Sequence, residues 1–215
     1  MNIIFCLFGT MIRSNCKGLD QFSAKRDPLE IFKEWFEAAS ESGIELPEAM
    51  SLATATRDAR PSNRIVLLKE FDKDGFKFYT NYESRKALEL DENPRASLVF
   101  HWAILRRQIR IEGDVTRIPE KESFKYFKTR PRNSQIGSWA SQQSTSLDSR
   151  EILLGRFEMY QKKFSGIEVP LPPFWGGYLL LPSTIEFWEG RDDRLHDRLL
   201  FIRQGVDWHS ERLFP

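Results

Sequence analysis

The chain has 215 residues, which suits one domain of ordinary size. Its residues are 40% hydrophobic and 13% aromatic, enough for a packed core, and this excludes a disordered protein. The 32 basic residues nearly balance the 31 acidic ones, so overall charge favours neither nucleic acid nor an anionic membrane as a partner. Local groups of basic side chains are therefore interpreted as sites for small anions.

The first 26 residues are predicted to be a poorly ordered tail, and residues 27–215 to form the domain. Residues 3–11 are apolar but too short to span a bilayer. Residues 1–18 lack acidic side chains, so an organelle presequence stays open, although a cytoplasmic location is the simpler prediction. Cys6 and Cys16 both lie in this tail, so neither a disulfide framework nor a metal site is expected.

The first predicted element of the domain is a helix. Asp27 can cap it, Pro28 suits its first position, and Glu30 stands three residues after the cap. Gly43 is expected to end it. Beyond this helix, apolar and polar residues alternate, which predicts strands over residues 51–56, 64–71, 76–80, 96–102 and 108–117.

Shorter elements complete the prediction. Helices are predicted over residues 84–92, 119–130 and 148–164, and further strands over residues 177–181, 184–188, 199–203 and 208–213. Strands do not alternate regularly with helices, which argues against a doubly wound nucleotide-binding fold. The pattern predicts a mainly β fold with flanking helices, of the antiparallel barrel type.

Two segments place basic side chains where a phosphate could bind. Arg64 and Lys69 mark the two ends of an apolar predicted strand. Ser84, Arg85 and Lys86 stand at the start of a predicted helix, where backbone N–H groups also favour an anion. Taken alone, each segment could equally be a solvated surface.

A third segment provides a second candidate anion site. Tyr126 and Arg130 are four residues apart, so they share a face of the predicted helix, and Ser134 follows closely. Two anion sites in a nearly neutral chain suggest two phosphorylated ligands. The sequence offers no plausible serine triad, carboxylate pair or metal cluster, so a cofactor is expected to supply the chemistry.

A charged segment near the C-terminus contains Arg194, His196 and Arg198. An extended chain would place these three side chains on one face. Two fixed positive charges beside a histidine are costly unless an anionic molecule docks there. A solvated turn is the alternative interpretation of this segment.

Together these segments resemble the pyridoxine (pyridoxamine) 5′-phosphate oxidase family. The resemblance runs in order from about residue 27 to 215 and rests on the joint spacing of RIVLLK at 64–69, FYTNYESRK at 78–86, RQ at 107–108, YFKTRPRNSQIG at 126–137, QS at 143–144, WGGY at 175–178, EFW at 186–188 and RLHDR at 194–198. It implies a split β-barrel homodimer with FMN at the subunit interface.

The resemblance also implies roles for individual residues. One subunit would bind the flavin through Arg64, Ile65, Val66, Leu67, Lys69, Tyr79, Thr80, Ser84, Arg85 and Lys86. The partner subunit would add Gln108, Gln143, Ser144, Trp188 and Arg198. The substrate phosphate would be held by Lys69, Tyr126, Arg130 and Ser134. Catalysis would depend on Arg194 and His196 beside the substrate ring and on Arg198 beside the flavin ring.

The implied reaction is the oxidation of pyridoxine 5′-phosphate and pyridoxamine 5′-phosphate to pyridoxal 5′-phosphate. Hydride would pass from C4′ of the substrate to flavin N5, and O₂ would be reduced to H₂O₂. One alternative is another split-barrel flavoprotein with a different substrate. A second is a non-catalytic protein that binds FMN or pyridoxal phosphate. Neither nucleic acid, nor a membrane, nor a metal is expected as a partner.

Four departures from the family pattern bear on these expectations. Ala59 stands where a turn glycine is usual, although alanine disfavours positive φ. Glu189 replaces a more usual glutamine, which adds a negative charge near Trp188. Phe214 takes the place of a small residue. Residues 1–26 do not clearly show the segment that can cover the substrate.

Overall fold

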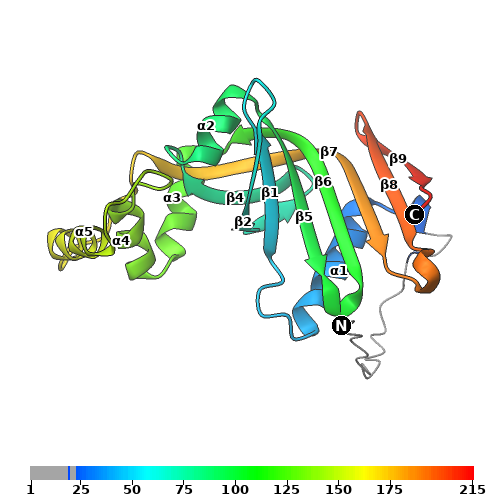
Figure 1. The fold of residues 1–215 in the computed structure, drawn as a ribbon, viewed down its shortest axis with the longest axis horizontal. Coiled ribbons are helices and arrows are strands. Elements are labelled where there is room, and N and C mark those ends of the chain that lie inside the picture. The colour runs from blue at the N-terminus through cyan, green and yellow to red at the C-terminus, as the bar shows by residue number, and fades with distance from the viewer. Residues whose placement is uncertain (1–18, 20–22) are drawn as a thin grey trace, which may run out of the picture.

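The computed structural model describes Leu19 and residues 23–215 (Figure 1). Residues 1–18, on which the targeting hypotheses and both cysteines fall, lie outside the described part. The expected domain boundary at residue 27 stays a prediction, although described residues before it pack on the domain. Leu19 is 4% exposed. In the 3-10 turn η1 (Ser23–Lys25), the carbonyl of Ala24 accepts a hydrogen bond from Ser210 Oγ (2.6 Å).

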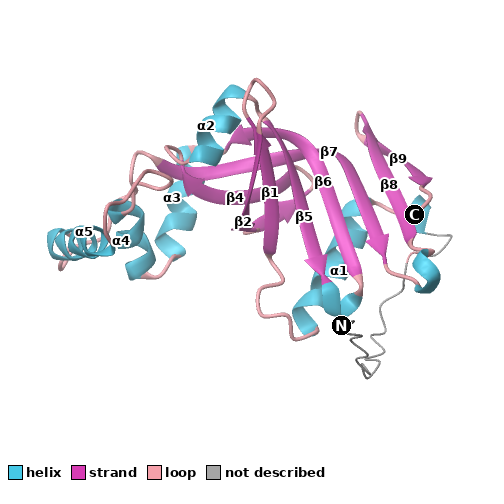
Figure 2. Cartoon of the chain, viewed as in Figure 1, coloured by secondary structure: helices cyan, strands magenta, loops and turns pink. Residues whose placement is uncertain are grey.

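Nine strands of the described part form one sheet, and every pair within it is antiparallel. They are β1 (Ala49–Ala55), β2 (Pro61–Leu67), β3 (Glu70–Asp72), β4 (Gly75–Asn81), β5 (Arg95–Trp102), β6 (Arg107–Arg117), β7 (Trp175–Glu189), β8 (Asp197–Gln204) and β9 (Asp207–Arg212). The order is β2-β1-β5-β6-β7-β4-β3, and β8 joins β7 to β9. The sheet curls into a half-barrel (Figure 2), which confirms the predicted antiparallel β architecture.

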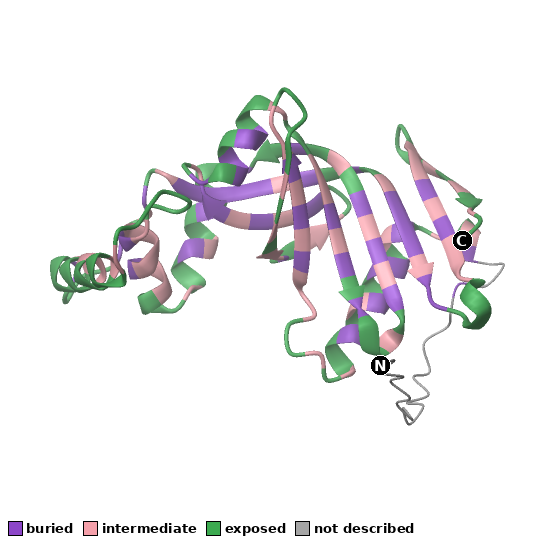
Figure 3. Cartoon of the chain, in the orientation of Figure 1, coloured by how far each residue is buried: buried purple, intermediate pink, exposed green. Residues whose placement is uncertain are grey.

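Five α-helices flank the described sheet: α1 (Pro28–Glu41), α2 (Arg85–Glu92), α3 (Glu120–Thr129), α4 (Arg132–Ala140) and α5 (Arg150–Lys163). The start of α1 is as predicted, because Asp27 Oδ1 accepts a hydrogen bond from the N–H of Leu29 (2.8 Å). The helices α3, α4 and α5 gather at one end of the molecule, where α5 has no fully buried residue and is largely exposed (Figure 3). No helix of the described residues is long and apolar enough to cross a membrane.

The core lies between α1 and the sheet. Phe32 of α1 makes edge-to-face contacts with Phe76 and Phe100, with ring centroids 4.9 and 5.3 Å apart. Trp35 packs in the same way on Phe187 of β7 at 5.3 Å. Burial of each of these aromatic side chains stabilises the fold by about 1.5–3 kcal/mol, so the packing of α1 against one side of the curved sheet stabilises the domain. A smaller cluster supports α3, α4 and α5, and its buried members are Phe127, Ile136, Phe164, Val169 and Trp175.

The prediction of one continuous strand over residues 64–71 is wrong. This segment divides into β2 and β3, because the chain turns at Leu68 and Lys69 and the N–H of Lys69 donates to the carbonyl of Lys77 (2.9 Å). Conversely, the two strands predicted over 177–181 and 184–188 form the single strand β7. Its register against β6 shifts between Glu112 and Gly113, and this shift carries β7 past Pro182.

The helical region after β6 also differs from the prediction. The helix predicted over 119–130 ends at Thr129, and Arg130 is extended (φ −73°, ψ 147°), so Arg130 and Tyr126 do not share a helix face. The helix α4 was not predicted. It buries only Ile136 and Ala140, too few apolar positions to show a helical period in the sequence.

Candidate active site

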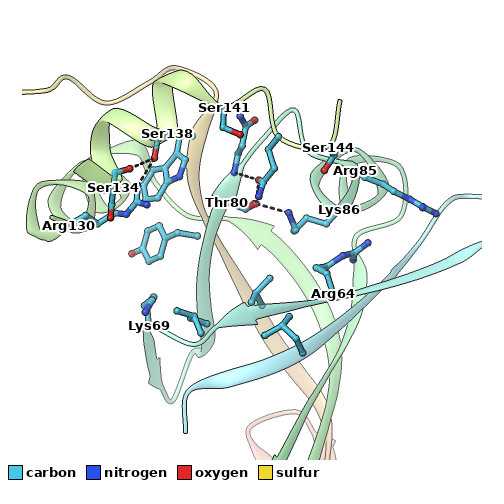
Figure 4. A pocket seen from close by; sticks show the side chains of 18 of the residues that line it. Arg64, Lys69, Thr80, Arg85, Lys86, Arg130, Ser134, Ser138, Ser141 and Ser144 are labelled. Atoms are coloured by element: carbon cyan, nitrogen blue, oxygen red, sulfur yellow. Dashed lines mark hydrogen bonds between the residues drawn. The ribbon is translucent and has the colours of Figure 1, made fainter. Parts of the chain in front are cut away.

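A cavity of about 750 Å³ opens among β2, β4, α2, α3 and α4 (Figure 4). It brings together most of the residues that were expected to bind flavin or the substrate phosphate: Arg64, Ile65, Val66, Leu67, Lys69, Tyr79, Thr80, Arg85, Lys86, Tyr126, Arg130, Ser134, Gln143 and Ser144. Ser84 lies just behind the wall, fully buried. Segments far apart in the sequence thus line one cavity.

One end of the cavity carries Arg64 from β2 and Arg85 and Lys86 from α2 (Figure 4). Lys86 is 5% exposed, and its Nζ donates to Thr80 Oγ1 (3.0 Å) and Ser84 Oγ (3.1 Å). Burial, followed by the nearby charge of Arg64, lowers the pKa of Lys86 to about 8. A buried ammonium hydrogen-bonded to hydroxyl groups gains from a bound anion, so this end fits a phosphate.

Glu89 of α2 lies behind these cations, and the sequence reasoning missed it. Its carboxylate accepts hydrogen bonds from the hydroxyls of Thr54 and Ser62. It also accepts bonds from Arg85 Nε (2.8 Å) and Arg64 Nη2 (3.3 Å). Burial acts to raise the pKa of Glu89, but these bonds lower it to about 2, so the carboxylate stays charged and holds both arginines at the cavity. The available signal was the i,i+4 spacing of Arg85 and Glu89.

The opposite end of the cavity has an aromatic wall. Tyr79 stacks on Tyr126 and on Trp175, with ring centroids 4.0 and 5.5 Å apart. The Arg130 guanidinium lies 4.8 Å from the centroid of Trp175, and its Nη1 donates to Ser138 Oγ (2.6 Å). Burial lowers the pKa of Arg130 and raises that of Tyr79 to about 12. This end therefore keeps a charged arginine beside neutral phenols.

Lys69 and Ser134 complete the second basic end, at which Arg130 also lies (Figure 4). The stack beside them depends on Gly177, because a Cβ there would lie 2.8 Å from Tyr79 Cε1 and 2.5 Å from Ile118 Cδ1. The two anion sites inferred from the sequence are therefore the two ends of one cavity.

Gln143 and Ser144 belong to the cavity of their own chain. Gln143 Oε1 accepts a hydrogen bond from Thr80 Oγ1 (3.1 Å), and both residues line the wall. This placement differs from the expectation that the partner subunit would supply them. No feature of the QS dipeptide in the sequence indicates which chain it serves.

The other expected site residues lie away from this cavity: Gln108, Trp188, Arg194, His196 and Arg198. Gln108 pairs with Trp188 and Trp188 with Arg198, so these three side chains share one face of β6, β7 and β8. The ring of His196 lies 4.6 Å from that of Trp188. These residues form a second group at the β8 end of the sheet, which we call the His196 group.

The His196 group and the cavity lie toward opposite ends of β7, because Trp175 at its start lines the cavity and Trp188 near its end packs on His196. Trp175, which lines the cavity, is thirteen residues before Trp188 on this strand, or on the order of 40 Å along extended chain. Gln108, Trp188 and Arg198 are only partly buried, so their face of the sheet is accessible to another molecule. Within one chain, the cavity and the His196 group are therefore far apart.

Arg198 is fixed in this group by a buried carboxylate. Its Nε donates to Glu186 Oε1 (2.7 Å), and this bond raises the pKa of Arg198. Arg110 Nη2 reaches the other oxygen of Glu186 at 2.7 Å. Two arginines therefore compensate the charge of Glu186, which holds the Arg198 guanidinium beside Trp188.

The departures at Ala59, Glu189 and Phe214 leave both groups intact, whereas the one expected in residues 1–26 falls largely outside the described residues. Glu189 follows Trp188 on β7, so it points to the opposite face, where its Oε1 accepts a hydrogen bond from Arg107 Nε (3.1 Å). Its negative charge is thus compensated away from the Trp188 face. Ala59 does adopt the positive φ expected of a glycine (61°), and Phe214 is almost fully exposed.

Family comparisons agree with this arrangement. The family model described as pyridoxamine 5′-phosphate oxidase matches residues 36–163, and the one described as pyridoxine 5′-phosphate oxidase C-terminal dimerisation region matches residues 175–215. The chain is 54% identical to the pyridoxine/pyridoxamine 5′-phosphate oxidase of Rubrobacter xylanophilus, over 92% of this chain and 91% of that protein. It is 50% identical to the enzyme of the same name from Colwellia psychrerythraea, over 98% and 96%.

Solved structures show the same fold. PhzG from Burkholderia lata 383, in complex with tetrahydrophenazine-1-carboxylic acid, matches with a TM-score of 0.86 at 34% identity, covering 94% of this chain and all of that one. A pyridoxamine 5′-phosphate oxidase-related, FMN-binding protein from Nostoc punctiforme matches with a TM-score of 0.72 at 20% identity, covering 89% of this chain and all of that one. With these relatives and this split barrel, the chain belongs to the pyridoxine/pyridoxamine 5′-phosphate oxidase family.

Proposed function

We propose that this chain is an FMN-dependent oxidase that converts pyridoxine 5′-phosphate and pyridoxamine 5′-phosphate to pyridoxal 5′-phosphate, with O₂ as the electron acceptor. The single observation that carries the proposal is one cavity with a basic group at each end. Such a cavity suits one phosphate from a cofactor and another from a substrate. The oxidases at 50–54% identity support the same assignment.

The residues at the α2 end fit the phosphate of FMN. Lys86 is buried and donates to hydroxyl oxygens, while Glu89 aims Arg64 and Arg85 at the same place. Each charge-assisted bond to a phosphate contributes about 1.5–3 kcal/mol. The strand β2 would lie along the rest of the cofactor through residues 65–67, which line the cavity.

At the other end, Lys69, Arg130 and Ser134 would hold the phosphate of the substrate. Binding energy gained at this remote phosphate positions the carbon that is oxidised. A bound FMN would supply the two-electron redox chemistry that this chain's own side chains lack, with O₂ as the final acceptor and H₂O₂ as the second product. The residues of this chain would bind and orient the substrate and would exclude water from the reacting atoms.

A second copy of the chain would complete the site with its His196 group. The matched dimerisation region covers residues 175–215, which include β7, β8 and the His196 group. There His196 and Arg194 would orient the substrate ring, and His196 would hold a proton toward it. Arg198 would place a fixed positive charge beside the flavin ring, where negative charge develops on reduction.

The test is turnover by the purified protein supplied with FMN. Addition of pyridoxine 5′-phosphate in air is expected to yield aldehyde and H₂O₂ in equal amounts, while unphosphorylated pyridoxine reacts far more slowly. The relationship to PhzG makes a ring carboxylate the second candidate substrate. Oxidation of a reduced phenazine carboxylate without oxidation of either B6 phosphate would contradict the proposal, as would FMN binding without turnover of any of these compounds.

A further inference from the structure

The loop between β7 and β8 carries both Arg194 and His196. It contains the 3-10 turn η3 (Asp192–Arg194), in which Asp193 and Arg194 have positive φ values of 54° and 61°. For residues other than glycine this conformation costs on the order of 1–2 kcal/mol each. Contacts elsewhere in the loop must therefore hold it in place.

Arg191 supplies such contacts at the start of the loop. Its Nη2 donates to Glu189 Oε2 (2.9 Å), and its Nε donates to Asp197 Oδ2 (2.6 Å). Glu189 and Asp197 face each other as the last paired residues of β7 and β8. The Arg191 guanidinium thus bridges the two strands where the loop leaves them. We call this bridge the Arg191 clamp.

The backbone of the clamped residue contacts the imidazole. The N–H of Arg191 donates to His196 Nδ1 (3.2 Å). Because Nδ1 accepts this bond, a neutral His196 carries its proton on Nε2. The ring also lies against Trp188, with the two planes 44° apart. Nε2 is therefore the nitrogen left for a bound molecule.

We propose that Arg191 is a positioning residue, which fixes His196 as the Nε2–H tautomer by clamping the backbone N–H that binds Nδ1. This inference rests on the proposed function, in which His196 lies against the substrate. It also gives Glu189 a role, because this carboxylate anchors one side of the clamp.

A second ion pair in the same loop provides a matched comparison. Arg106 Nη1 lies 3.2 Å from Asp192 Oδ1, but these side chains are 55% and 90% exposed. Exposed pairs of this kind are worth about 0–1 kcal/mol. The Arg191 clamp engages the buried carboxylate of Glu189, so it is the stronger restraint of the two. Asp192→Ala is therefore the control for Arg191→Ala.

The direct test is the nitrogen-15 spectrum of histidine-labelled protein at pH 8 with excess FMN. His196→Asn identifies the resonances of His196 among the three histidines. The parent protein and Asp192→Ala are expected to show His196 protonated on Nε2. Arg191→Ala is expected to show a mixture of tautomers, and Arg191→Lys to restore part of the parent pattern. A parent protein protonated on Nδ1, or an Arg191→Ala spectrum equal to the parent, would overturn the proposal.

Kinetics provide the second readout. Arg191→Ala should lower kcat about ten-fold, within the roughly 100-fold that a 1 Å displacement can cost, and should leave KM for pyridoxine 5′-phosphate unchanged. Asp192→Ala should change neither constant by more than about two-fold. A rise in KM without a fall in kcat would contradict a positioning role. Absence of any oxidation in the parent protein would refute the proposed function, whereas the nitrogen spectrum would still decide the tautomer.

Discussion

The two ends of β7 differ in what they offer a ligand. At the Trp175 end, a cavity of about 750 Å³ has an aromatic wall and a basic group at each end. At the Trp188 end, an accessible sheet face carries His196 and Arg198 beside the tryptophan. In the proposed function the first end binds the two phosphates, and the second supplies the side chains for proton transfer and for stabilising charge.

In the proposed function, binding and catalysis are therefore divided along one strand. A single β7 keeps them far apart, but a second β7 related by two-fold symmetry can bring its Trp188 end to the first chain's cavity. The same operation completes both cavities at once. In that arrangement the proposed reaction would require the dimer.

Substitution of His196 is expected to change activity most and to distinguish the functions of the two ends of β7. His196→Asn should lower kcat by about 10²–10⁴-fold, because a positioned proton-transfer group contributes this much. The affinity for FMN should stay within about two-fold, because the phosphate is held at the other end of β7. Steady-state assays and flavin fluorescence titration measure the two quantities.

His209→Asn is the matched control, since His209 is an exposed histidine of β9. It should change neither quantity. Parallel losses of rate and FMN affinity in His196→Asn would mean that the two ends do not have separate functions.

A pH titration sharpens the account of the cavity. The pKa of Lys86 in the free protein is about 8, so this ammonium is mostly charged at pH 7 and mostly neutral at pH 9. A bound phosphate favours the charged form, so binding at pH 9 requires proton uptake. The FMN affinity should therefore fall about ten-fold from pH 7 to pH 9.

Lys86→Met tests whether this lysine is the cause. The variant should bind FMN more weakly at pH 7, and its affinity should change little up to pH 9. An unchanged slope in Lys86→Met would assign the pH dependence to another group.

A substitution in the turn between β1 and β2 is expected to have the weakest effect, a small change in thermal stability. Ala59 has a φ of 61°, so Ala59→Gly should relieve backbone strain of about 0.5–1 kcal/mol. For a chain of this size the midpoint of thermal unfolding should rise by about 1–4 °C, with kcat unchanged. Ala53→Gly within β1 is the control and should lower the midpoint. Equal shifts in both variants would contradict the strain at Ala59.

The local sequence pattern predicted the elements whose limits depend on residues nearby in the sequence. Alternation gave β4, β5 and β6 nearly to the residue, and the Asp27 cap located α1. The prediction failed where the limits of a strand depend on residues far away in the sequence. The break at Lys69 depends on the carbonyl of Lys77, and the continuity of β7 depends on a register shift in β6.

For the site, the resemblance selected residues that the fold does gather in one cavity. Glu89 and Trp175 were missed, because a carboxylate behind the arginines and a ring behind the tyrosines become visible only after packing. The placement of Gln143 in its own chain's cavity was equally hidden. Sequence spacing carries no information on which copy of a chain a side chain serves.

The most direct test of the central claim is a mixed dimer. One copy would carry Lys86→Met and the other His196→Asn, with different affinity tags so that only the heterodimer is purified. This heterodimer should show about half the activity of the parent dimer, because one of the two composite sites has both intact parts. At an FMN concentration that saturates the parent sites but not those carrying Lys86→Met, a heterodimer of the parent chain with the double variant should be nearly inactive. The opposite pattern, with activity only in the second heterodimer, would show that each chain forms its own site.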